Sequence, residues 1–99
     1  MKYLIIDGMV SGSGIRDSVE GGYLRPEDLG LSTTLKHKIT CWLECYEDAH
    51  YAGYKDEGIV AKLDAEGMEI CSLVSSEVGE SKVEYYSAAE MMKISIDSE

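Results

Sequence analysis

Basic residues are scarce in this sequence. Its 99 residues include 9 lysines and arginines against 19 aspartates and glutamates, and the formal net charge is -10 at pH 7. Nucleic-acid phosphates and anionic membrane surfaces are both bound through lysine and arginine. The composition therefore argues against nucleic acid and membrane as partners. A basic protein would be attracted by this charge, although the simpler explanation is that the charge keeps a small domain soluble.

Long apolar runs are also lacking. The N-terminal segment is too short for a signal-peptide core or a membrane span, and Asp7 interrupts it. Three cysteines, Cys41, Cys45 and Cys71, cannot all pair within one chain, and reduced thiols are the simplest explanation. We therefore expect a cytoplasmic protein.

Strands are predicted at both ends of the chain. The first ten residues include four consecutive apolar side chains, which predicts a strand over residues 2–10 that is buried on both faces. Residues 82–86 alternate, with Tyr85 in the core and Tyr86 at an exposed position. Residues 92–96 alternate again, so the chain ends in a hairpin or in one strand with a tail.

Two helices are predicted between these strands. Apolar residues recur at steps of three and four over residues 33–50, where Trp42 and Tyr46 should anchor the core. The second helix, over residues 57–78, has an apolar face made by Ile59, Leu63, Ile70, Val74 and Val78. Gly67 lies on this face at a cost of about 1 kcal/mol relative to alanine. We expect it to allow close approach of the neighbouring helix.

Together these elements predict one α+β domain over residues 1–99. Its two layers are a small mixed sheet of about three strands and two main helices packed on one face. The strands on either side of the helices are expected to pair in parallel. Residues 11–31 are predicted to be a long glycine-rich loop, in which Pro26 begins one helical turn. Loops of this length often carry function.

The glycine-rich loop supplies the first candidate site. Ser11, Ser13, Arg16 and Asp17 follow the first strand, where backbone N–H groups and an arginine can bind an anion. The pattern is neither a dinucleotide-binding fingerprint nor a P-loop. A structural or partner-contacting role is therefore the simpler interpretation. Asp7 is expected either to be buried at a site or to accept hydrogen bonds from the loop.

A metal or nucleophilic site is not indicated. His37, Cys41 and Cys45 recur at four-residue steps, but a rise of about 12 Å separates the ends of this row. Such side chains cannot close on one zinc ion, and a Cys–His pair needs an orienting third group. We predict no catalytic residue, no metal and no cofactor, and we expect a binding domain rather than an enzyme.

The end of the first helix supplies the second candidate site. Four residues gather there or just beyond: Glu47, His50, Tyr51 and Tyr54. Acidic side chains late in a helix oppose its macrodipole, so their presence here favours a role other than stabilising the helix. Aromatic residues are enriched at protein interfaces. An acidic rim around tyrosines suits a basic protein surface, while a plain solvated face is the simpler alternative.

Four motifs span most of the chain. They are SGSGIRDSVEGGYLRPEDLGLS, Trp42-x-x-x-Tyr46-Glu47-x-Ala49-His50, Asp64-x-Glu66-Gly67-x-Glu69-Ile70 and KVEYYS. In this order they resemble those of a group of small, acidic, uncharacterised bacterial α+β proteins. The resemblance implies a bacterial source and the fold class, and it supplies no catalytic residues.

Two functions are compatible with these residues. The first is a non-enzymatic interaction domain, immunity- or adaptor-like, that binds a basic protein through the acidic helix end and the Tyr51–Tyr54 loop. The second is a small-ligand or small enzyme domain that binds an anion through residues 11–17, with Arg16 on the anion. A homodimer through the edge of the C-terminal strand is a third reading, so both monomer and homodimer stay open.

Overall fold

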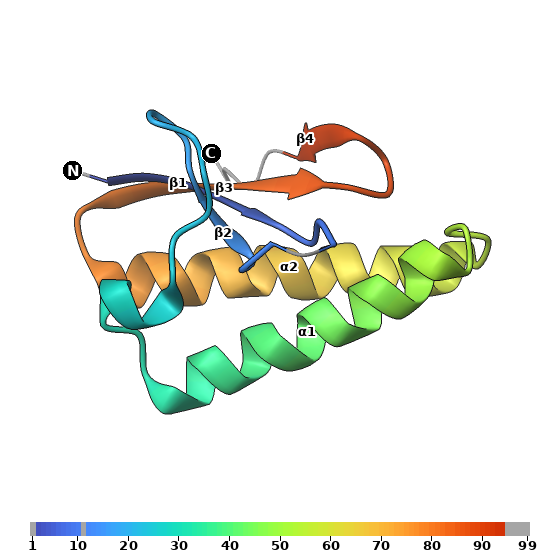
Figure 1. Cartoon of the computed structure of the whole chain (residues 1–99), viewed down its shortest axis with the longest axis horizontal. Coiled ribbons are helices and arrows are strands. Elements are labelled where there is room, and N and C mark those ends of the chain that lie inside the picture. Colours follow the sequence, from blue (N-terminus) through green and yellow to red (C-terminus); the bar gives the residue numbers. More distant parts are fainter. Residues whose placement is uncertain (1, 11, 95–99) are drawn as a thin grey trace.

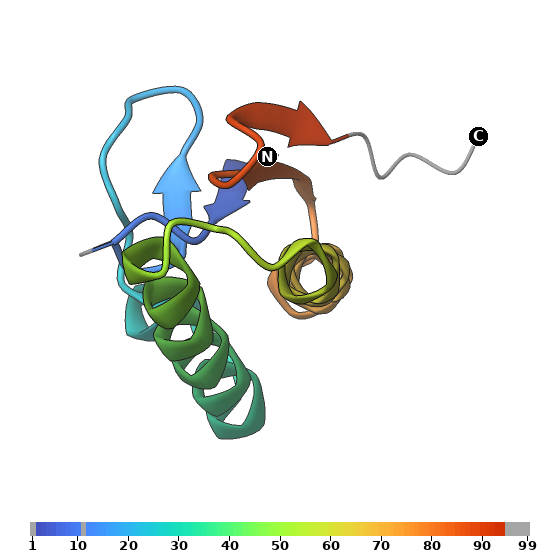
Figure 2. The same cartoon turned by 90° about the vertical axis from the view of Figure 1, so that its right-hand side faces the viewer.

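The protein is built from a sheet and two long helices in two layers. The computed structural model describes residues 2–10 and 12–94. Its elements are β1 (Lys2–Asp7), β2 (Ile15–Asp17), the 3-10 helix η1 (Pro26–Leu29), α1 (Thr33–Tyr51), α2 (Glu57–Val78), β3 (Ser81–Ser87) and β4 (Met92–Ile94). Both long helices lie on the same side of the sheet (Figures 1 and 2). The predicted α+β class and two-layer architecture are confirmed.

The sheet is mixed and has the strand order β2-β1-β3-β4. Strands β1 and β3 pair in parallel, from Lys2 opposite Ser81 to Asp7 opposite Tyr86, as the helical crossover predicted. Strand β2 pairs antiparallel with β1, and β4 pairs antiparallel with β3. The predicted strand at 92–96 is described only as far as residue 94, so Ile96 lies outside the described residues.

The segment predicted to be one long loop contains β2 and η1. Ile15 is fully buried, and its carbonyl accepts a hydrogen bond of 2.8 Å from the Leu24 N–H. The Ser13 hydroxyl donates to the Leu24 carbonyl at 2.5 Å. A strand of three residues that follows directly on Gly14 has too little alternation to be recognised from sequence. Pro26 begins η1, as predicted.

Capping residues fix the starts of both long helices. The Ser32 hydroxyl accepts a hydrogen bond of 3.1 Å from the Leu35 N–H, and the Asp56 carboxylate accepts one of 3.0 Å from the Gly58 N–H. Such side-chain acceptors satisfy N–H groups that have no partner within the helix. Gly79 ends α2 at a φ of 89°, a conformation that favours glycine.

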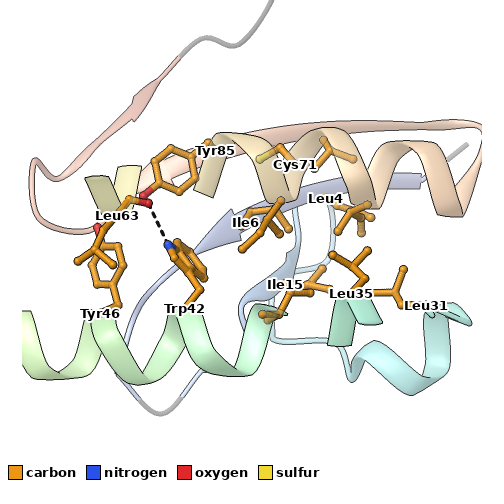
Figure 3. Close-up of a cluster of buried hydrophobic side chains, with 14 of the residues drawn as sticks. Leu4, Ile6, Ile15, Leu31, Leu35, Trp42, Tyr46, Leu63, Cys71 and Tyr85 are labelled. Atoms are coloured by element: carbon orange, nitrogen blue, oxygen red, sulfur yellow. Dashed lines mark hydrogen bonds between the residues drawn. The ribbon is translucent and has the colours of Figure 1, made fainter. Parts of the chain in front are cut away.

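The core lies between the helices and the sheet (Figure 3). Trp42 and Tyr46 are 2% and 0% exposed, as predicted, and their rings meet edge to face at a centroid distance of 5.3 Å. The Trp42 indole N–H donates a hydrogen bond of 2.9 Å to the Leu63 carbonyl, which joins α1 to α2. Tyr85 of β3 is fully buried and lies 6.2 Å from the Trp42 ring.

Two predictions about α2 are wrong. Ile59 was predicted to lie on the buried face, but it is 49% exposed and its neighbour Val60 is buried instead. The reason is that the buried stripe of α2 runs through Asp64 and Cys71, so its centre lies away from Ile59. Gly67 faces the Tyr85 ring of β3 rather than the neighbouring helix. A Cβ atom at this position would overlap that ring.

We expect Gly67→Ala to lower the free energy of unfolding by about 1–3 kcal/mol, because the Tyr85 ring would have to move. This expected loss is the net change in the free energy of unfolding, because the packing cost outweighs the gain of about 1 kcal/mol in helix propensity that alanine brings. Urea unfolding measures the change. The matched control is Gly58→Ala in the same helix, where an added Cβ meets only Asp56 Oδ1, at 3.3 Å. Equal stabilisation by both substitutions would contradict the assigned packing.

Candidate functional site

The glycine-rich loop is held by an ion pair with a buried carboxylate. Asp7 is 0% exposed, and its Oδ2 lies 3.2 Å from Nη2 of Arg16. The Tyr23 hydroxyl donates a hydrogen bond of 3.0 Å to Asp7 Oδ1, and the Met9 N–H donates one of 3.3 Å to the same oxygen. The Arg16 guanidinium lies 5.8 Å from the ring centroid of Tyr86, which is half-buried rather than exposed as predicted.

The other loop candidates also have partners within the loop. The Ser13 hydroxyl donates to the Leu24 carbonyl and accepts a hydrogen bond of 3.4 Å from the Ile15 N–H. The Asp17 carboxylate accepts hydrogen bonds from the Glu20 and Val19 N–H groups, and these bonds lower the pKa of Asp17. Ser11 lies outside the described residues. The three described candidates therefore hold the conformation of the loop itself.

Burial and the contact with Asp7 predict that the Tyr23 hydroxyl loses its proton at a higher pH than a free tyrosine. Burial, and then the neighbouring Asp7 charge, raise the pKa of Tyr23 from 10.0 to about 12. The stabilisation from this hydroxyl is therefore complete below pH 10 and is lost as the pH rises to about 12.

Phenolate absorbance of the wild type minus that of Tyr23→Phe should show a step near pH 12, recorded while circular dichroism reports a folded chain. A step near pH 10 would show that the Tyr23 hydroxyl is neither buried nor held on Asp7.

The cysteine and histidine row lies on the outer face of α1. Cys41 and Cys45 are exposed, and the Cys41 sulfur is 3.6 Å from His37 Nε2. Among residues 2–10 and 12–94, no three histidine, cysteine or acidic side chains gather as metal ligands. Cys71 is buried, and burial raises the pKa of its thiol to about 12, so it is not a reactive thiolate.

Three of the four candidates from the acidic helix end lie together. His50 Nδ1 is 3.3 Å from the Tyr54 hydroxyl, and the His50 ring meets the Tyr51 ring edge to face. Tyr51 is 73% exposed, whereas Tyr54 is half-buried at a φ of 55°, which is uncommon for a bulky residue. Glu47 lies about one turn earlier in α1. It lines a shallow pocket of about 260 Å³ between α1 and the glycine-rich loop.

A second pocket, of about 570 Å³, opens beside Tyr54. Its lining residues come from the connection between the helices, the first turns of α2 and the turn after β3: Tyr54, Glu57, Val60, Ala61, Asp64, Ala89 and Glu90. Three of them are carboxylates, and none is basic. These segments meet at the right-hand end of the molecule in Figure 1.

The carboxylate of Asp64 is the most buried charge of this pocket. Its residue is 8% exposed, and Oδ1 accepts a hydrogen bond of 2.6 Å from the Tyr85 hydroxyl. Its Oδ2 accepts one of 3.1 Å from the Ser87 hydroxyl. The ion pairs among the described side chains do not include Asp64. Burial and this hydrogen bond raise the pKa of Tyr85 well above its ordinary range.

Sequence reasoning did not identify Asp64 as a site residue. One signal was present, because Asp64 lies next to Leu63 on the apolar face of the predicted helix. An acidic residue in that place is buried and needs partners. Its partners Tyr85 and Ser87 come from β3, more than 20 residues away.

A scan against protein-family models finds no match, and a search of curated proteins finds no similar sequence. No helix of the described chain combines the length and the apolar character that crossing a membrane requires.

Proposed function

We propose that the protein is a non-enzymatic interaction domain that binds a basic protein through one end of the molecule. We call this surface the acidic end and define it by six carboxylates: Glu47, Asp48, Asp56, Glu57, Asp64 and Glu90. Tyr51 and Tyr54 lie among them on the connection between the helices. The single observation that carries the proposal is the pocket beside Tyr54, which three carboxylates and no basic side chain line.

The electrostatics of the acidic end support a basic partner. None of its six carboxylates takes part in an ion pair among the described residues. Like charges held close together repel one another, and a positively charged surface would relieve that repulsion while steering association. The exposed Tyr51 ring adds an aromatic surface of the kind enriched at interfaces.

The anion-binding alternative has weaker support. An anion at the glycine-rich loop would need the Arg16 guanidinium, which is paired with Asp7. A free anion would have to compete with a fully buried carboxylate for that cation. The described residues of the loop thus favour a structural role, and the basic-partner proposal is the better supported one.

The proposal is tested by affinity capture from the cells that naturally express the protein, followed by purification of the captured protein. We expect a basic protein whose dissociation constant rises with ionic strength. The triple variant Glu47→Gln/Asp48→Asn/Glu57→Gln should weaken binding by about tenfold or more, since each rim charge contributes up to about 1 kcal/mol.

The matched control is Glu20→Gln/Glu27→Gln/Glu80→Gln, which removes the same charge from exposed positions outside the acidic end. It should change the affinity by less than about twofold, because screened charges at a distance contribute little. A neutral or acidic partner, or equal losses in both triple variants, would refute the proposal.

A further inference from the structure

We infer that the pocket beside Tyr54 takes a single arginine side chain, with its guanidinium on the Asp64 carboxylate. The identity of the donor rests on the proposed function, since the basic partner would supply this arginine. The affinity for a guanidinium group is a property of the pocket itself and can be measured without the partner.

The carboxylate of Asp64 has no cationic partner among the described side chains. The residue is 8% exposed, lines the pocket and has two neutral hydroxyls as its hydrogen-bond partners. A carboxylate has about four acceptor positions, so two hydroxyl donors leave acceptor capacity unused. Burying a charge is unfavourable unless an opposite charge compensates it. A cation entering the pocket would supply that compensation.

The other lining residues of the pocket also suit a long cationic side chain. Glu57 in the first turn of α2 and Glu90 in the turn after β3 add two exposed carboxylates. Val60, Ala61 and Ala89 supply apolar walls that can contact the methylene groups of a long side chain. The pocket therefore combines charge with an apolar lining, as a long cationic side chain requires.

The chemistry of the pocket favours arginine over lysine. A guanidinium presents five donors in a planar fork, so it can reach more than one carboxylate at a time. It is also more weakly hydrated than an ammonium group and packs on aromatic rings, of which Tyr54 provides one. A lysine side chain would satisfy fewer of these acceptors and lose more hydration.

The test is a nuclear magnetic resonance titration of the full chain with N-acetyl-arginine methylamide. We expect saturable shifts, at millimolar probe, in the backbone amides of residues 54–64 and 87–90. The lysine analogue should bind more weakly. The citrulline analogue, which has the same shape and no charge, should produce no saturable shift.

Two variants report on the pocket independently. Asp64→Asn removes the charge but keeps an oxygen that can accept from Tyr85, and Ala61→Phe fills the pocket while all its carboxylates stay in place. Each should weaken arginine-probe binding by about tenfold or more. Ala65→Phe is the matched control for Ala61→Phe, because Ala65 is exposed on the next turn and does not line the pocket. Should Asp64→Asn fail to fold, Ala61→Phe still shows whether the arginine probe binds in the pocket.

The outcomes separate the pocket from the proposed function. Equal binding of the citrulline analogue, or full arginine-probe affinity in Ala61→Phe, would overturn the inference. If a basic partner binds wild type and Ala61→Phe equally, and the arginine probe gives no saturable shift, the pocket inference fails and the proposed function survives. If the arginine probe binds at the pocket but no basic partner exists, the proposed function fails and the pocket inference survives.

Discussion

The Tyr85 hydroxyl donates a hydrogen bond of 2.6 Å to the Asp64 carboxylate in the interior of the protein. The Tyr85 ring lies against Gly67, where an added Cβ atom would overlap it, and 6.2 Å from the Trp42 ring. Trp42 in turn donates to the Leu63 carbonyl. This chain of contacts joins β3 to α2 and α2 to α1, so the placement of both helices on the sheet depends on it.

The same carboxylate connects the fold with the proposed function. Asp64 faces the core through Tyr85 and Ser87 and also lines the pocket beside Tyr54. Neutral hydroxyls hold its position without neutralising its charge. The acidic end therefore has a fixed negative charge at depth, together with exposed carboxylates such as Glu57 and Glu90 around it. Such preorganisation favours a cationic partner because little reordering accompanies binding.

Local signals in the sequence predicted the two long helices. Features that depend on long-range contacts were missed. Periodicity located α1 to within one residue of its end and α2 at both ends. Strand β2 was missed because its pairing with β1 is decided by partners elsewhere in the chain. The roles of Gly67 and Asp64 were missed for the same reason, since only the packed sheet brings Tyr85 to them.

A double-mutant cycle on Asp64→Ala and Tyr85→Phe, each of which removes this hydrogen bond, tests this account most directly. The free energy of unfolding is measured by urea titration for the wild type, both single variants and the double variant. Groups in direct hydrogen-bond contact show coupling energies of about 0.5–3 kcal/mol. A bond between a hydroxyl and a buried carboxylate is expected in the upper part of that range, at about 1–3 kcal/mol. Losses that simply add would contradict the account, because Asp64 and Tyr85 would then act independently.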